Sequence, residues 1–281
     1  MKCLAFALAC LCLAFAGPVH AQDHATVEEL DVNTTGSVFP GPREGETRNV
    51  WVWRPPNAPA NTRLPVLYMA DGLDGVFIAL SHLKAPIEAG TIPPILVISI
   101  DPRSRPEQRA AEYVRTYPGG GDAYQVHERW LLEEVIPWAE RTQLAANERS
   151  KRFIGGFSNG ADWALSMGND HPDVFAGALA HSPFGGSADW VGEHASELRW
   201  VVTGGTRETA GSMRRGGDLP RDIITALERR GAVVRGCIGP WNHSGRPWRE
   251  LTPGSLVWLM QLGDAAAVET QRERSFCHSG T

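Results

Sequence analysis

Apolar runs of strand length alternate with longer amphipathic segments over most of this chain, and few folds accommodate that alternation. The run 94–100 is continuously apolar, as strands buried on both faces of a parallel sheet tend to be. Segment 124–142 has apolar residues at helical spacing. We expect strands at 49–54, 65–70, 94–100, 152–157, 175–181, 198–203 and 232–237, and helices at 124–142, 159–168, 221–230 and 247–262. Strand and helix in repetition predict an α/β fold with a mostly parallel central sheet and helices on both faces.

Three segments depart from this pattern. Segment 49–54 alternates with period two, which predicts an antiparallel strand at the edge of the sheet. Residues 103–123 are rich in Arg, Pro and Gly, so we expect a long loop near the functional site. The tail after residue 262 is polar, and we expect it to be mobile. No internal repeat or long linker divides the chain, which favours a single domain over residues 22–281.

Residues 1–21 have the features of a secretory signal peptide. Lys2 precedes an apolar run over residues 4–16, and the segment ends in Val19-His20-Ala21. The run is shorter than the roughly 20 residues that span a bilayer, and no other stretch could cross one. We therefore expect cleavage near Ala21 and an exported protein, periplasmic or secreted. An uncleaved membrane anchor is the alternative.

Removal of a signal peptide would change which cysteines the protein retains, and export would place them in an oxidising compartment. Three of the five cysteines leave with the signal, and Cys237 and Cys277 remain. In an oxidising compartment two cysteines favour a disulfide, which would attach the tail to strand 232–237; two unrelated thiols are the alternative. The formal net charge is −5, without a basic run or stripe. This charge argues against nucleic acid as a partner and favours small neutral molecules.

The sequence Gly156-Phe157-Ser158-Asn159-Gly160 matches the pattern G-x-S-x-G. An expected strand ends directly before Ser158 and an expected helix begins directly after it, which is the setting of a nucleophile elbow. The two glycines occupy positions where side chains would collide with the neighbouring strand and helix. The helix also directs its positive end at a developing oxyanion. We predict that Ser158 is a nucleophile; an ordinary tight turn is the alternative.

A serine hydroxyl needs a general base, and the base needs an acid that orients it. In folds with this elbow the residues follow the order serine, acid, histidine. His243 lies between the last expected strand and the last expected helix, and we predict that it is the base, in preference to His278 in the tail. His181 is expected to be a hydrogen-bonded structural residue, and His127 a helix-surface residue.

The acid is expected in the loop after strand 198–203. Glu208 is the first acid in that loop, and we predict that it orients the histidine. Asp218 and Asp222 are competitors. Asp222 has a separate explanation, because acids are common in the first turn of a helix.

Backbone N–H groups are expected to bind the oxyanion of the tetrahedral intermediate. One is the amide of Asn159, the residue after the nucleophile. The other is expected from the sharp turn after strand 65–70, where Leu73 is the first choice and Gly72 the alternative.

Three further side chains are candidates for substrate contact. Trp241 and Trp248 flank His243 and would wall the acyl or alcohol pocket, although tryptophans packed in a core explain the same pattern. Arg109, from segment 103–123, would meet a charged substrate; a solvated ion pair is the alternative.

Four separated motifs resemble the esterase family that includes esterase D, feruloyl esterases, enterochelin esterases and the mycolyltransferases. They are Leu67-Tyr68-Met69-Ala70-Asp71-Gly72, Arg109-Ala110-Ala111-Glu112-Tyr113, Gly156-Phe157-Ser158-Asn159-Gly160-Ala161 and His171-Pro172-Asp173-Val174-Phe175. With His243 and Trp248 they span nearly all of residues 22–281. The resemblance implies an α/β-hydrolase fold, a Ser–acid–His triad and no metal. In the mycolyltransferase branch the leucine after Asp-Gly supplies the second oxyanion amide, which corresponds to Leu73.

The chain departs from the family at two places near the expected pocket. Many relatives have Gly-Gly-His at the base, where this chain has Trp241-Asn242-His243. Many have Ser-Pro-Ser after the sixth strand, where this chain has His181-Ser182-Pro183-Phe184. We therefore expect a small-molecule ester as the substrate without assigning one relative's substrate.

These residues predict a serine carboxylic-ester hydrolase that acts through an acyl-enzyme, without a cofactor. An acyltransferase with the same residues is the first alternative, and a non-catalytic binding protein on the same fold is the second. The sequence has no H-E-x-x-H motif and no clustered Cys/His spacing, which disfavours a metalloenzyme.

Overall fold

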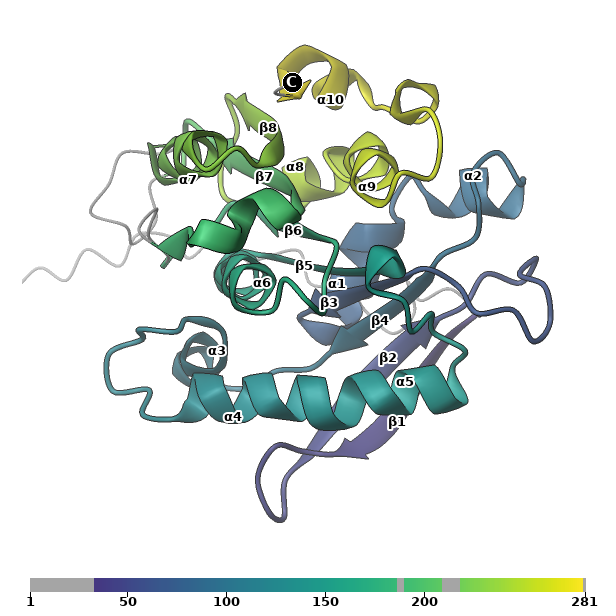
Figure 1. Cartoon of the computed structure of the whole chain (residues 1–281), viewed down its shortest axis with the longest axis vertical. Coiled ribbons are helices and arrows are strands. Elements are labelled where there is room, and N and C mark those ends of the chain that lie inside the picture. Colours follow the sequence, from purple (N-terminus) through teal and green to yellow (C-terminus); the bar gives the residue numbers. More distant parts are fainter. Residues whose placement is uncertain (1–32, 186–189, 209–217, 280–281) are drawn as a thin grey trace, which may run out of the picture.

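A nine-stranded sheet runs through the molecule in the order β1-β2-β4-β3-β5-β6-β7-β8-β9 (Figure 1). The computed structural model describes residues 33–185, 190–208 and 218–279, so the expected signal peptide, residues 1–21, lies outside the described residues. Six central strands pair in parallel, namely β3 (Val66–Ala70), β4 (Leu96–Ile100), β5 (Arg152–Phe157), β6 (Gly177–His181), β7 (Arg199–Gly205) and β8 (Val233–Gly239). Antiparallel strands flank them, namely β1 (Thr34–Pro40) and β2 (Thr47–Trp53) on one side and β9 (Cys277–Ser279) on the other.

Helices cover both faces of this sheet. They are α1 (Gly72–Leu80), α2 (Lys84–Glu88), α3 (Pro106–Tyr113), α4 (Ala123–Trp130), α5 (Ile136–Thr142), α6 (Asn159–Asp170), α7 (Asp218–Arg229), α8 (Gly245–Glu250), α9 (Pro253–Met260) and α10 (Gln271–Phe276). A π-helical segment, η2 (Leu131–Val135), joins α4 to α5, and the three form one long rod (Figure 1). The predicted fold class, a mostly parallel sheet with helices on both faces, is confirmed. Among the described helices none is long and apolar enough to span a bilayer.

Alternate residues of each central strand face opposite sides of the sheet, and a separate hydrophobic core forms on each side. Tyr68 and Ile98 belong to the core beneath α3 to α7. Met69 and Val97 belong to the core beneath α1, α2 and α9. Because both faces are covered, β3 and β4 bury every side chain, which explains their predominantly apolar sequence.

Four expectations about elements are wrong. Segment 49–54 lies in an antiparallel strand, β2, but not at the edge, because β1 pairs along its outer side. Segment 103–123 contains α3, which begins with a proline at a position helices tolerate. Segment 247–262 forms two helices, because Pro253 cannot continue α8 and instead begins α9. The tail after residue 262 is structured: it forms a short 3₁₀ turn, η6 (Ala265–Ala267), then α10 and β9.

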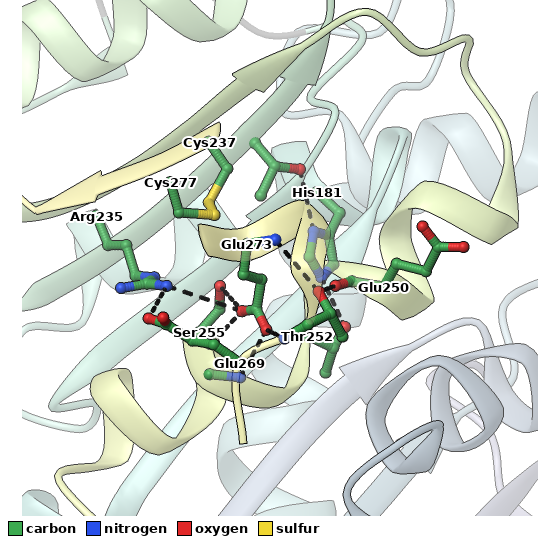
Figure 2. The surroundings of a disulfide bond; sticks show 12 residues. His181, Arg235, Cys237, Glu250, Thr252, Ser255, Glu269, Glu273 and Cys277 are labelled. Carbon is green, nitrogen blue, oxygen red and sulfur yellow. Dashed lines mark hydrogen bonds and ion pairs between the residues drawn. A yellow bond between two sulfur atoms is a disulfide. The ribbon is translucent and has the colours of Figure 1, made fainter. Parts of the chain in front are cut away.

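A disulfide joins Cys237 of β8 to Cys277 of β9, which is one of the two possibilities that the sequence left open. Their Cα atoms are 4.0 Å apart and the two residues are direct partners in the antiparallel ladder. Figure 2 shows the bond beside the buried polar groups that hold α10. The bridge therefore explains why a polar tail is ordered against the sheet.

His127 and His181 are both fully buried. His181 is hydrogen-bonded to Thr203 Oγ1 at 3.0 Å and Thr252 Oγ1 at 3.1 Å, as expected of a structural histidine. His127 was expected on a helix surface, and this expectation is wrong. Its ring packs edge-on against Tyr113 at 5.5 Å and Trp163 at 5.6 Å, because α3 covers that side of α4.

We expect the protein to lose stability as the pH falls from about 6.5 towards 3. Burial lowers the pKa of His127 and of His181 to about 3, whereas an imidazole in an unfolded chain titrates near about 6.5. Between these values the unfolded chain binds protons that the folded chain does not. The free energy of unfolding therefore rises with pH, by up to about 1.4 kcal/mol per pH unit for each histidine.

Urea unfolding at several pH values between about 4 and 7 measures this slope. Carboxylates contribute in the same direction at the acidic end, so the diagnostic comparison is with His127→Phe. Within the described residues the His127 ring has no hydrogen-bond partner, so phenylalanine is a close replacement. A slope that is the same in wild type and His127→Phe would show that His127 does not contribute.

Candidate active site

Ser158 stands at the turn between β5 and α6, with φ 55° and ψ −127°. A positive φ is costly for a residue with a side chain, so the surrounding structure must hold this turn. The Ser158 amide donates a 2.9 Å hydrogen bond to the carbonyl of His181. A Cβ on Gly156 would lie 2.3 Å from the Gly160 carbonyl oxygen, and one on Gly160 would lie 2.8 Å from Ala70 Cβ. The two glycines therefore allow the close approach that the elbow requires.

Ser158, His243 and Glu208 form a continuous hydrogen-bonded chain. The distance between His243 Nε2 and Ser158 Oγ is 2.9 Å, and that between His243 Nδ1 and Glu208 Oε2 is also 2.9 Å. The carboxylate only accepts, so Nδ1 donates to it and Nε2 is left to accept the serine proton. The three residues come from the ends of β5, β7 and β8, which meet at one edge of the sheet.

The competing acids lie elsewhere along the chain. Asp218 is the first residue of α7, and Asp222 is exposed on that helix. Glu208 is the acid that the structure brings to His243.

Two groups that hold Glu208 were missed from the sequence. Its Oε1 atom accepts hydrogen bonds from Ser182 Oγ at 2.8 Å and from the Gly205 amide at 2.6 Å. The Ser182 oxygen in turn accepts from Trp248 Nε1 at 2.8 Å. Both carboxylate oxygens are thus occupied, which fixes the plane of the carboxylate beneath the imidazole. Ser182 belongs to one of the two departures from the family motifs, and that was the only sequence signal near it.

A cavity of about 620 Å³ opens in front of Ser158 and His243. Its lining combines charged, polar and aromatic residues: Asp71, Asp74, Asp101, Pro102, Arg103, Ser104, Pro106, Arg109, Phe157, Ser158, Asn159, Phe184 and His243. Phe184 lies 5.3 Å from the His243 ring, centroid to centroid. The buried carboxylate of Asp162 accepts from the amides of Phe184 and Gly185, which holds this side of the cavity.

Arg109 lies in the cavity wall, as expected, but its charge is already paired. Its Nε and Nη2 atoms lie 2.5 and 2.8 Å from the two carboxylate oxygens of Asp71, and Nη1 lies 3.1 Å from Asn159 Oδ1. The bidentate pair ties α3 to the turn after β3, and the hydrogen bond from Nη1 to Asn159 ties α3 to the first residue of α6.

Asp101 is a further charged group in the wall. Its carboxylate accepts from Asn49 Nδ2 at 2.8 Å and from Trp51 Nε1 at 2.9 Å. Burial, together with the nearby carboxylates of Asp71 and Asp74, raises the pKa of Asp101. The cavity is therefore charged and polar on the side of α3, and its apolar lining residues are Phe157, Phe184, Pro102 and Pro106.

Neither expected tryptophan lines the cavity. Trp248 lies behind the imidazole, with its ring edge-on to His243 at 5.0 Å and stacked on Phe157 at 4.7 Å. Trp241 is buried against Phe276 of α10, on the far side of the strand ends. The expectation of a pocket wall formed by Trp241 does not fit this placement, because C-terminal structure that was not foreseen covers the indole.

The turn after β3 lies at the edge of the cavity, which Asp71 and Asp74 line. Asp71 and Gly72 both have positive φ, of 70° and 53°, and a Cβ on Gly72 would lie 1.7 Å from Asp101 Oδ1. Leu73 follows, between two residues that line the cavity. Within the described part of the chain, the amides of Leu73 and Asn159 have no hydrogen-bond acceptor. These N–H groups are therefore available to a ligand.

No group of three or more His, Cys, Asp or Glu side chains in the described ranges is arranged to bind a metal ion. A parallel sheet with a serine at the sharp turn after β5, and a histidine in the loop after β8, is the fold of the α/β-hydrolases.

A family model described as "Putative esterase" matches residues 42–249, and the chain belongs to that family. The resemblance in its motifs is thereby confirmed, and membership identifies the protein as a carboxylic ester hydrolase. No curated protein sequence matches the chain.

Solved esterase structures share the fold at low sequence identity. A ferulic acid esterase has 14% identity and a TM-score of 0.65, with 82% of this chain and 98% of that chain covered. A ferulic acid esterase of the anaerobic fungus Anaeromyces mucronatus has 17% identity and a TM-score of 0.61, with 88% of this chain and 96% of that chain covered. An S-formylglutathione hydrolase of Staphylococcus aureus has 15% identity and a TM-score of 0.58, with 81% of this chain and 96% of that chain covered. These similarities show a shared fold.

Proposed function

We propose that the protein hydrolyses carboxylic esters through an acyl-enzyme on Ser158, with His243 as the general base and Glu208 as the acid that orients it. The observation that carries this proposal is the hydrogen-bonded chain from Ser158 Oγ through the imidazole to Glu208, with both imidazole contacts at 2.9 Å. These distances lie within reach for proton transfer.

In the first half of the reaction, Ser158 Oγ attacks the ester carbonyl carbon while its proton passes to His243 Nε2. The tetrahedral intermediate collapses, the bond to the alcohol oxygen breaks, and the imidazolium returns the proton to that oxygen. In the second half, water attacks the acyl-enzyme and gives a proton to the same nitrogen. The carboxylic acid then leaves and Ser158 regains its proton. Glu208 stays ionised and stabilises the imidazolium in both halves.

We assign the oxyanion site to the amides of Asn159 and Leu73, with Gly72 as the alternative to Leu73. Asn159 begins α6, so the helix dipole adds to its N–H group. The left-handed turn at Asp71 and Gly72 leads directly to Leu73 and is braced by Asp101 and the Asp71–Arg109 pair.

The substrate that fits this cavity best is a small ester with polar substituents. Most of the residues that line the cavity have charged or hydrogen-bonding side chains, and a long aliphatic chain would desolvate them without replacing their partners. We also propose that the protein is exported after cleavage near Ala21. The signal-like N-terminus and the Cys237–Cys277 disulfide support this location, since such bonds persist in oxidising compartments.

A fluorophosphonate probe tests the proposed nucleophile. The folded protein is expected to take up one probe molecule, and peptide mass mapping is expected to find it on Ser158, because only a base-activated serine reacts quickly. Heat-unfolded protein is the control and is expected to remain unlabelled. Folded protein that stays unlabelled, or that carries the probe on another residue, would refute the assignment.

The same preparation separates hydrolysis from acyl transfer. Product analysis with rising concentrations of an acceptor alcohol is expected to show the free acid as the main product. Strong preference for the alcohol over water would identify an acyltransferase that uses the same acyl-enzyme.

A further inference from the structure

The segment after α9 folds back onto the strand that leads to His243 (Figure 2). Three residue pairs of β8 and β9 are in register, Arg235 with Ser279, Gly236 with His278 and Cys237 with Cys277, and the last pair is also the disulfide. β8 ends at Gly239, and the loop that carries His243 begins there. The covalent attachment therefore lies directly upstream of this loop.

Buried polar contacts fix the same segment to the helices that follow His243. The carboxylate of Glu273, which is fully buried, accepts from the Gly254 amide at 2.9 Å and from the Ser255 amide at 2.7 Å, and so caps the start of α9. Arg235 of β8 pairs with Glu269, directly before the segment, at 2.7 Å, and lies 4.0 Å from Glu273 within it, as Figure 2 shows. Segment 270–279 is thus anchored both before and after the His243 loop.

Trp241 fills the space between this segment and the ends of β7 and β8. On one side its ring lies edge-on to Phe276 at 5.5 Å, with the guanidinium of Arg272 5.2 Å from its centroid. On the other side two glycines make room for it. A Cβ on Gly239 would lie 2.0 Å from the indole Cζ3 atom, and one on Gly205 would lie 2.5 Å from Cδ1.

The backbone around Trp241 links the loop of His243 to the loop of Glu208. The carbonyl of Trp241 accepts from the Arg207 amide at 3.1 Å, and the carbonyl of Gly239 accepts from the Thr206 amide at 2.8 Å. The Gly205 amide donates to Glu208 Oε1 at 2.6 Å. A shift of Trp241 would therefore move the histidine and the carboxylate together, relative to Ser158 on β5.

We propose that Trp241 is a positioning residue for ester hydrolysis, and that segment 270–279, held by the Cys237–Cys277 disulfide, is the support that keeps it in place. The proposal rests on the proposed function, because the groups that it positions are His243 and Glu208 relative to Ser158. It assigns a role in turnover to a part of the chain that does not touch the cavity. A segment that only stabilises the fold would change the melting temperature and leave kcat unaltered.

The test compares four variants with wild type at a temperature well below each melting temperature, with kcat expressed per serine titrated by the fluorophosphonate probe. Trp241→Ala is expected to lower kcat by about 30- to 100-fold with KM within about threefold, since a displacement near 1 Å has effects of that size. Phe276→Ala and the double variant Cys237→Ala/Cys277→Ala are expected to lower kcat about 3- to 10-fold. Trp241→Phe, which keeps an aromatic ring and loses no hydrogen bond within the described residues, is expected to restore most of the activity.

Trp258→Ala is the matched control. Trp258 also stacks with an arginine, Arg199, at 3.9 Å, but that residue begins β7, at the opposite end from Gly205. The kcat of Trp258→Ala is expected to match that of wild type. The proposal is overturned if Trp241→Ala, Phe276→Ala and the cysteine variant all keep wild-type kcat per titrated serine while their melting temperatures fall. If Trp241→Ala does not fold, the other two variants decide. Failure of wild type to be labelled on Ser158 would instead refute the proposed function.

Discussion

Ser158→Ala is expected to lower kcat for ester hydrolysis by about 10⁶-fold, the order of loss seen when a serine enzyme loses its nucleophile. The variant loses the oxygen that forms the acyl-enzyme, so water must attack the bound ester directly. The backbone amides of Asn159 and Leu73, the proposed oxyanion site, remain, and they are expected to leave a rate above that of the reaction in water. Hydrolysis of a nitrophenyl ester of a short acid, followed by absorbance, measures the change. The circular dichroism spectrum is expected to match wild type, because only one hydroxyl group is removed.

Ser166→Ala is the matched control for this variant. Ser166 is fully buried, lies on the helix that follows Ser158, and its hydroxyl has no hydrogen-bond partner in the described part of the chain. Its removal is expected to leave kcat within about twofold. More than about 1% of wild-type kcat in Ser158→Ala, insensitive to the fluorophosphonate probe, would mean that another group attacks the ester.

The central architecture could be predicted from the sequence because its signals are local. A strand buried on both faces must be continuously apolar, as 94–100 is, and the elbow needs glycine where a side chain would strike the next strand or helix. The order serine, acid, histidine then assigned Glu208 and His243 to the ends of consecutive strands, since parallel strands end at one edge of a sheet. In the structure His243 contacts Ser158, and Glu208 contacts His243.

The parts that could not be predicted depend on contacts between distant segments. β1 has weak strand character of its own, with polar and exposed residues, and is held by its ladder to β2. α10 is short and polar, and is fixed by a disulfide and by a glutamate that caps another helix. Trp241 was expected in the pocket because it is two residues from His243, yet α10 buries it on the other side. Separation along the chain says little about the direction of a side chain in a loop.

Ser182 illustrates the same limit within the site. Its hydroxyl joins Trp248 to Glu208, but a serine before a proline at a strand end has many explanations in a sequence. Only the fold brings β6, β7 and α8 together at one carboxylate. Sequence motifs therefore find the groups that react, and they miss the groups that hold those groups in place.

His243→Ala is expected to lower kcat by about 10⁵- to 10⁶-fold, nearly as much as loss of the serine. Without the imidazole no base removes the proton from Ser158 Oγ, and no acid protonates the leaving alkoxide. The double variant Ser158→Ala/His243→Ala is expected to be no slower than either single variant. When two residues take part in the same proton transfer, removing either one abolishes that transfer, and removing the second costs little more. The kcat values of wild type, the two single variants and the double variant give the coupling free energy between Ser158 and His243 in the transition state.

His194→Ala is the control for this cycle, because His194 is an exposed histidine whose contacts are with Glu193 and Glu197 on the surface. It is expected to keep wild-type kcat. Fluorophosphonate labelling of Ser158 in His243→Ala is expected to slow to the same degree as turnover, since both reactions need the proton removed from Oγ. If the two single losses multiply in the double variant, or if labelling stays fast without the imidazole, then His243 does not activate Ser158. The 2.9 Å contact between Nε2 and Oγ would then be structural, and the base would have to be sought elsewhere in the cavity wall.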